Sequence, residues 1–253
     1  PPRSTLFPYT TLFRSPILVK FIDANDWLSI QVHPDDHLAA LRGTGRGKTE
    51  MWYILDAEPG AQLISGFNRE MDRKLYQHMA TRNQFREMMN FTEVLEGDVF
   101  YMPAGRVHAL GPGILLAEIQ QTSDTTYRVY DWDRTDAEGK ARELHTEEAL
   151  DAFDFSYHPD VRQREKTVPG KTRTLVESPY FTTRIVPLIR PIERDYSETD
   201  SFVILLATRG AANIEVEGNR YPIREGEVIL LPAITNKVIF DPAEAINLLE
   251  ITL

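Results

Sequence analysis

Two histidines in this sequence stand in patterns that suit a metal ion. Gln31-Val32-His33 follows an apolar run, and the two-residue period of a strand would place Gln31 and His33 on one face. His108 ends the segment GDVFYMPAGRVH, in which a glycine, an apolar strand and a Pro-Ala-Gly bend precede the histidine. A bend of this kind would project His108 into the mouth of a β-barrel.

A carboxylate could complete this set. Glu50 lies where the glycine-rich loop GTGRGKTE passes into the strand-like run MWYIL. Two imidazoles, one carboxylate and one amide oxygen suit a divalent ion such as zinc. The chain has no cysteine, which excludes thiolate ligands and disulfides. Taken singly, Gln31 would be an edge-strand residue and Glu50 a solvated loop charge.

Most histidines in proteins are partly buried polar residues and bind no metal. Four of the six in this chain lie in helical or loop settings without an evident partner, and they keep that simpler interpretation: His37, His78, His145 and His158.

The elements around these residues are mostly strands. Two apolar runs in 17–30 flank an Asp-Ala-Asn-Asp turn and predict a hairpin. A short helix is expected over 34–41, and near-helical spacing predicts a helical insertion over about 68–92, broken near 81–83. The segment GKARELHTEEALDAF has helical character, and strands dominate the sequence beyond it.

A repeat connects the two halves. GDVFYMPAGRVH (97–108) aligns without gaps to GEVILLPAITNK (226–237), with the glycine, the apolar strand and the proline shared. The first copy fits the cupin pattern of Gly, five residues, Pro, one residue, Gly, two residues and His. The predicted fold class is therefore mainly β, with two cupin-like barrels of the jelly-roll type and a small helical insertion. Lys237 replaces His108 in the second copy, so only the first barrel is expected to bind a metal.

Four ordered motifs carry a family resemblance. QVHPDD, GKTEMWYIL, GDVFYMPAGRVHAL and QQTSDTTYRVYDW resemble signature segments of type I mannose-6-phosphate isomerases, in their short bacterial form. The resemblance implies an isomerase that interconverts mannose 6-phosphate and fructose 6-phosphate through an enediol. It also implies one divalent ion, which is expected to be zinc. It implies the following metal ligands: Gln31, His33, Glu50 and His108.

The resemblance also suggests roles for six other residues. Arg128 matches an active-site arginine, Lys48 a residue close to the sugar, Glu118 and Asp124 acidic positions that assist proton movement, and Lys20 and Ser29 positions near the phosphate. Simpler interpretations exist, since Lys20 could be a surface lysine and Glu118 an exposed strand residue. The sequence leaves open which group carries the proton.

Two other functions compete with the isomerase. His33, Glu50 and His108 could form the two-His-one-carboxylate triad of an iron-dependent cupin oxygenase, although Gln31 as a fourth ligand argues against it. A non-catalytic sugar-binding bicupin would use the metal for structure only.

Charge and hydropathy limit the partners. Lys and Arg number 28 against 38 Asp and Glu, and the net charge of −10 disfavours binding to nucleic-acid phosphates or anionic lipid. No run approaches the roughly 20 apolar residues of a membrane helix. We expect a cytoplasmic protein whose partner is a small-molecule sugar phosphate.

Three segments are expected along the chain. Residues 5–15 match one reading frame of a sequencing adapter, so 1–15 are predicted to be an assembly artefact. Residues 16–155 would form the metal-binding catalytic cupin domain, without its N-terminal strands, and 156–253 a second, degenerate cupin domain without a metal site.

Overall fold

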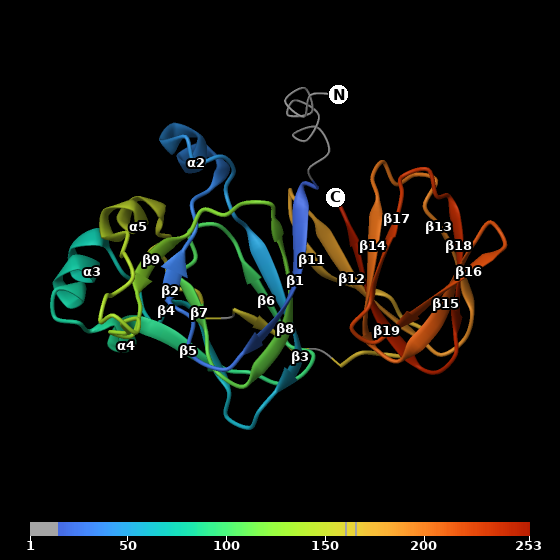
Figure 1. The fold of residues 1–253 in the computed structure, drawn as a ribbon, viewed down its shortest axis with the longest axis horizontal. Helices are drawn as coiled ribbons and strands as arrows, with labels where there is room; N and C mark the ends of the chain where they lie inside the picture. Colours follow the sequence, from blue (N-terminus) through green and yellow to red (C-terminus); the bar gives the residue numbers. More distant parts are fainter. Residues whose placement is uncertain (1–14, 160, 165) are drawn as a thin grey trace. The chain divides into compact units, whose positions relative to one another are not determined.

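The computed structural model describes residues 15–159, 161–164 and 166–253. The predicted adapter segment lies outside the described residues except for Ser15. The chain divides into two compact units, one up to Arg164 and one from Glu165 onward (Figure 1). Both are built mainly of β-strands.

The first unit contains two five-stranded sheets, in the orders β1-β8-β3-β6-β10 and β5-β4-β7-β2-β9. Its strands are β1 (Ile17–Ala24), β2 (Ile30–Val32), β3 (Glu50–Ala57), β4 (Gln62–Phe67), β5 (Met89–Glu93), β6 (Val99–Met102), β7 (His108–Leu110), β8 (Ile114–Gln121), β9 (Tyr127–Tyr130) and β10 (Arg162–Gln163). Its helices are α2 (Asp36–Arg42), α3 (Arg73–Ala80), α4 (Phe85–Met88) and α5 (Thr146–Ala152).

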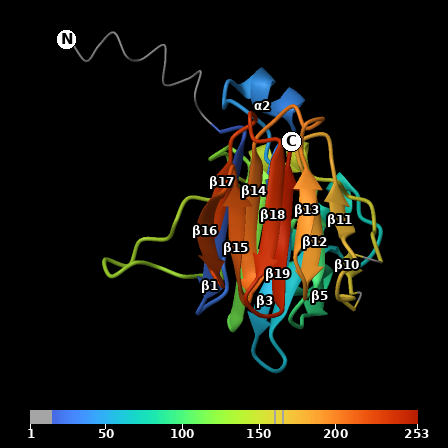
Figure 2. The same cartoon turned by 90° about the vertical axis from the view of Figure 1, so that its right-hand side faces the viewer.

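The second unit contains the sheets β11-β12-β19-β14-β17 and β13-β18-β15-β16, the latter visible in Figure 2. Its strands are β11 (Arg173–Glu177), β12 (Thr182–Leu188), β13 (Ile192–Asp195), β14 (Val203–Arg209), β15 (Ala211–Val216), β16 (Asn219–Arg224), β17 (Val228–Leu231), β18 (Lys237–Pro242) and β19 (Ile246–Thr252).

The two units repeat one eight-strand order. In the first unit the sheets contain 1-8-3-6 and 2-7-4-5, and β12 to β19, taken in sequence order, pair in the same two patterns. The repeated segments occupy equivalent places, since Gly97 precedes β6 and Gly226 precedes β17. Among the described residues the sheets remain open and do not close into barrels.

The predicted hairpin over 17–30 is wrong. Strand β1 pairs with β8, whereas β2 pairs with β7 and β9 in the other sheet. The apolar runs reveal two strands and the polar turn between them. Local alternation cannot reveal that the turn carries the chain from one sheet to the other.

The helices follow their sequence signals. Asp35 caps α2 by accepting a hydrogen bond from the Leu38 amide, and Gly43 ends it in the left-handed conformation. Asp72 caps α3 in the same way. Helices α3 and α4 lie in the span expected to be helical. None of the described helices has the length and apolarity needed to cross a membrane.

Apolar packing decides which way the β2 and β7 side chains point. Ile30 and Val32 join a buried cluster with residues of α3, α4 and α5, and Val107 and Ala109 join the same cluster. Because side chains alternate along a strand, Gln31 and His108 must face the opposite side of their sheet. Burial of the apolar neighbours thus turns these two polar residues toward the interior between the sheets.

Candidate metal centre

A row of polar residues crosses the β4-β7-β2-β9 sheet. His108 lies opposite both Gln31 on β2 and Ser65 on β4, and Gln31 lies opposite Arg128 on β9. Residues directly opposite each other share a face of the sheet. Glu50 begins β3 in the other sheet. Two sheets and five strands therefore contribute to one site.

His33, Glu50 and His108 converge in the interior. The Glu50 Oε1 atom is 3.2 Å from His108 Nε2, and Oε2 is 3.6 Å from His33 Nε2. One candidate ligand atom from each residue lies within 4.8 Å of the others. All three are nearly inaccessible to solvent, with exposures of 1%, 0% and 1%. The structure thus brings together three of the four expected ligands as a buried cluster.

Hydrogen bonds to backbone carbonyls orient both imidazole rings. His33 Nδ1 donates to the Thr125 carbonyl at 3.0 Å, and His108 Nδ1 donates to the Arg106 carbonyl at 2.8 Å. A proton on Nδ1 makes Nε2 the acceptor nitrogen, and both Nε2 atoms face Glu50. Burial lowers the pKa of both histidines. The charges of His108 and Lys48 lower the pKa of His33 further, and Glu50 raises the pKa of His108 by less than burial lowers it. Both rings are therefore held neutral, the form that binds a metal.

Glu50 is a buried carboxylate with an ion-pair partner but no hydrogen bond. Neither of its oxygens makes a hydrogen bond, although both are buried. Lys48 Nζ makes an ion contact with Oε2 at 2.9 Å and also lies 3.2 Å from His33 Nε2. A divalent cation could take the place of Lys48 at this carboxylate, because a buried charge is stable only when paired. The residues present fit a metal ion.

Gln31 lies beside this cluster with its amide toward His108. Its Nε2 atom is 3.3 Å from His108 Nε2. A half-turn of the amide would exchange nitrogen and oxygen and present an acceptor to the same space. The fourth expected ligand is therefore within reach of the site.

A second polar group adjoins the cluster. Glu118 on β8 accepts from Lys20 Nζ and from Trp52 Nε1, both at 2.9 Å. Glu118 is buried, with 4% exposure, so its interpretation as an exposed strand residue is wrong. The Trp52 ring stands edge-on to His108, with 5.3 Å between centroids. Sequence reasoning missed Trp52, although it shares a face with Glu50 two residues earlier.

The other predicted residues are more dispersed. Arg128 Nη1 donates to the Glu143 carbonyl at 2.7 Å, while its buried Nε has no hydrogen-bond partner among the described residues. The Arg128 amide donates to His145 Nδ1 at 3.0 Å, a contact that the isolated sequence position of His145 did not reveal. Ser29 is buried just before β2. Asp124 is exposed in the loop after β8.

A hydrogen-bonded clamp holds the loop that carries Lys48 and Glu50. Gln121 Oε1 accepts from the Thr49 amide at 2.8 Å, and Gln121 Nε2 donates to Asp36 Oδ1 at 3.3 Å. The same Asp36 oxygen accepts from the Gly47 amide at 2.8 Å. The clamp fixes the backbone on both sides of Lys48.

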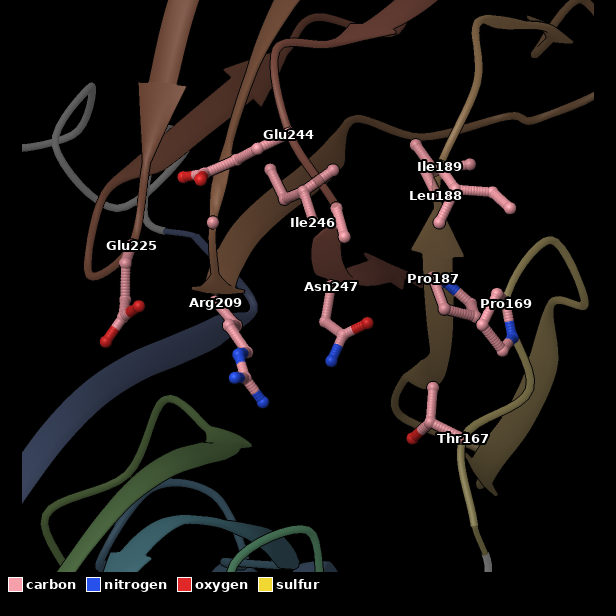
Figure 3. A pocket seen from close by; sticks show the side chains of 12 residues that line it. Thr167, Pro169, Pro187, Leu188, Ile189, Arg209, Glu225, Glu244, Ile246 and Asn247 are labelled. Atoms are coloured by element: carbon pink, nitrogen blue, oxygen red, sulfur yellow. The ribbon is translucent and has the colours of Figure 1, made fainter.

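A separate hollow lies in the second unit. It has a volume of about 550 Å³ and is shown in Figure 3, where Arg209 and Asn247 project together and Pro169 and Pro187 lie side by side. It contains none of the predicted site residues. The candidate chemistry therefore stays with the buried cluster of the first unit.

The sequence is similar to known proteins of one family. A family model described as the cupin domain of mannose-6-phosphate isomerase matches residues 171–241. The mannose-6-phosphate isomerase of Streptococcus mutans is 37% identical over 218 residues, which cover 86% of this chain and 68% of the relative. ManA of Bacillus subtilis, also called a mannose-6-phosphate isomerase, is 38% identical and covers 87% and 70%.

Solved structures agree. The crystal structure of mannose 6-phosphate isomerase from Bacillus subtilis matches with a TM-score of 0.82 and 30% identity, covering 95% of this chain and 76% of that one. An Archaeoglobus fulgidus structure, called a putative mannosephosphate isomerase, matches at 0.76 with 20% identity, a likeness of fold alone.

Proposed function

The chain belongs to the mannose-6-phosphate isomerase family, and we propose that it interconverts mannose 6-phosphate and fructose 6-phosphate through an enediol intermediate. One observation supports this above the others. A buried carboxylate without hydrogen bonds, Glu50, lies 3.2 Å from His108 Nε2 and 3.6 Å from His33 Nε2. These three side chains could hold a divalent cation. Aldose-ketose isomerisation needs such a positive charge beside the substrate, because negative charge develops on the sugar oxygens.

We propose zinc as the ion, held by Gln31, His33, Glu50 and His108. Two imidazole nitrogens and two oxygens form a set that zinc accepts. When bound, such an ion supplies Lewis-acid stabilisation of negative charge on the sugar oxygens. The two backbone carbonyls behind the imidazoles keep the ring orientations fixed before any ion arrives.

The surrounding residues would bind and orient the sugar phosphate. Arg128 and Lys48 add positive potential near the reacting carbons, and Lys20 and Ser29 would hold the phosphate at the adjoining face. Of the two acidic candidates, Glu118 is the better proton carrier. It is buried and hydrogen-bonded to Trp52, and the Trp52 ring packs against the proposed ligand His108. Asp124 stands exposed in its loop.

We also propose that both units are cupin-type jelly rolls, with a catalytic domain expected over 16–155 and a second domain without a metal over 156–253, while the compact units themselves divide after Arg164. Their shared eight-strand order supports this. The relatives support a small sugar phosphate as partner, the net charge of −10 disfavours nucleic acid and anionic membrane, and we place the protein in the cytoplasm.

The test combines metal analysis with turnover. The zinc-loaded protein should convert mannose 6-phosphate anaerobically and exchange the C2 proton with heavy water. Arg128→Ala should retain zinc and lose at least about 100-fold in turnover, the size expected when a charged contact to the transition state is removed. Oxygen consumption with bound iron, or sugar binding without proton exchange, would contradict the isomerase. Near-normal turnover of the variant would remove Arg128 from the mechanism.

A further inference from the structure

The second unit holds a charged pair at the place that Lys20 and Glu118 occupy in the first. Lys20 lies opposite Glu118 between β1 and β8, and Arg184 lies opposite Glu250 between β12 and β19. The next strand places Trp52 opposite Glu118 and Leu205 opposite Glu250. The equivalence therefore extends over three adjacent strands.

The gapless repeat fixes the same register. Trp52 lies opposite Phe100, three residues after Gly97, and Leu205 lies opposite Ile229, three residues after Gly226. Sequence repeat and strand pairing, which are independent observations, thus give one alignment of the two units.

The metal ligands have no counterparts in that alignment. Val203 stands at the position of Glu50, because each lies opposite the fifth residue after the repeated glycine. Lys237 takes the place of His108, and Asp195 opposite it takes the place of Gln31. The second unit has kept the cation and carboxylate and lost the metal set.

Glu250 organises a buried cluster. It is 4% exposed, and its Oε2 accepts from the Tyr196 hydroxyl at 2.6 Å. Arg184 Nη1 lies 3.5 Å from Oε1, and Arg194 Nε lies 3.7 Å from Oε2. Burial and the charge of Glu250 raise the pKa of Tyr196, so its hydroxyl stays a donor. One carboxylate therefore faces three donor groups.

Hydrogen-bond donors outnumber acceptors in this cluster. A guanidinium carries five N–H donors, and charge-assisted bonds prefer distances under 3 Å. Both arginines exceed that distance to Glu250. Arg194 Nη2 donates to Thr172 Oγ1 at 2.5 Å, yet its buried Nε has no hydrogen-bond partner among the described residues. Spare, oriented guanidinium donors are what an oxyanion binds.

Both arginines line a cavity. It has a volume of about 610 Å³, within the range of small-ligand sites. We call it the second-unit pocket; it is distinct from the hollow of Figure 3. Its lining includes Arg184, Arg194, Tyr196, Ser201, Glu250 and Thr252. Asp195, Glu198 and Asp200 also line it, but they are exposed, so solvent screens their charges.

We propose that the second-unit pocket binds the phosphate group of a small metabolite through Arg184 and Arg194, without a metal and without chemistry. Glu250 and Tyr196 hold the two guanidinium groups in place. The choice of a sugar phosphate as the natural ligand rests on the proposed function, whereas the oxyanion contact does not.

The test is an NMR titration of the metal-free protein with inorganic phosphate. Amide shifts in β12, β13 and β19 should saturate, and fructose 6-phosphate should produce them while fructose does not. Arg184→Gln and Arg194→Gln should each weaken binding at least about tenfold, the loss expected for one charged hydrogen bond. Arg190→Gln, an exposed arginine of the same unit, should change binding less than about twofold.

Two outcomes would overturn the proposal. One is the absence of saturable shifts in the second unit of the wild-type protein. The other is unchanged phosphate binding in both glutamine variants. If either variant unfolds, Arg194→Lys keeps the charge and loses the fork, and it should bind more weakly than wild type. Because the titration needs no metal and no turnover, failure of the isomerase assay would leave its result standing.

Discussion

Lys48 and a divalent ion would compete for the same lone pairs. The Lys48 ammonium lies 2.9 Å from Glu50 Oε2 and 3.2 Å from His33 Nε2, and both atoms belong to proposed metal ligands. Like charges at this separation repel each other strongly in a buried site. Metal binding would therefore release Lys48 from the cluster and leave its ammonium free for the sugar.

Two substitutions separate these roles. Glu50→Gln should weaken zinc binding at least about 100-fold, because a charged ligand is lost. Lys48→Met should bind zinc at least as tightly as wild type, since a competing charge is removed, while turnover falls. Competition with a coloured chelator measures both affinities. Glu250→Gln, which changes a buried carboxylate of the second unit at the position of Glu118, serves as the control and should leave zinc binding unchanged. Weaker zinc binding in Lys48→Met would contradict the competition.

The position of the loop before β3 depends on Gly47, which packs against the backbone at the start of α2. A Cβ atom on Gly47 would lie 2.5 Å from the Asp35 carbonyl carbon and from the Asp36 nitrogen, both of them backbone atoms. Backbone cannot yield as a flexible side chain can. Any side chain here must push the loop away from α2 and strain the clamp formed by Asp36 and Gln121.

Gly47→Ala should therefore lower stability by roughly 1–3 kcal/mol and weaken zinc binding, because Lys48 and Glu50 move with the loop. Gly45→Ala is the matched control. Its Cβ would meet open space, so only the positive φ of 98° is penalised, at about 1 kcal/mol. Urea unfolding and chelator competition measure the two effects. Equal zinc affinity in the two variants would show that the clamp does not position the site.

The connection after β9 is held by one carboxylate. Burial alone would raise the pKa of Asp131, but hydrogen bonds from Arg142 and Arg134 outweigh it and lower the pKa below its usual value. A depressed pKa stabilises the folded state above the unfolded value and loses that effect as the pH falls through the folded value.

Asp131→Asn should cost about 1–3 kcal/mol at neutral pH, the range for a charged buried hydrogen bond. The difference from wild type should hold constant between pH 7 and 5, because the carboxylate is ionised in both folded and unfolded chains there. Below about pH 4 it should shrink as the unfolded chain takes up protons. Urea unfolding across this range measures it. A difference that grew on acidification would rule out the ionised carboxylate as the cause.

How far the sequence predicts the molecule differs from one kind of element to another. The caps of α2 and α3 and the segment ending in His108 are local signals, and the structure follows them. The pairing of β1 with β8 joins residues about a hundred positions apart, which no local pattern encodes. Trp52 and Gln121 escaped notice for the same reason, since their roles come from Glu118 and Asp36, which lie in other elements.

The distribution of ligands predicts how the whole molecule responds to metal. All four proposed ligands lie in the first unit, and in the second unit Asp195, Val203 and Lys237 stand in the places of Gln31, Glu50 and His108. An ion that binds only the folded state stabilises the unit that holds it, by about 2.7 kcal/mol at a hundredfold excess over Kd.

Hydrogen exchange with and without zinc should therefore distinguish the units. Core amides of β3 and β8 should exchange up to about 100-fold more slowly with zinc, and core amides of β14 and β19 should not change. Glu50→Gln should abolish the slowing in β3 and β8. Equal slowing in both sets would mean that the units open in one cooperative step, because binding energy confined to residues 31–108 could then reach β14 and β19 only through shared unfolding.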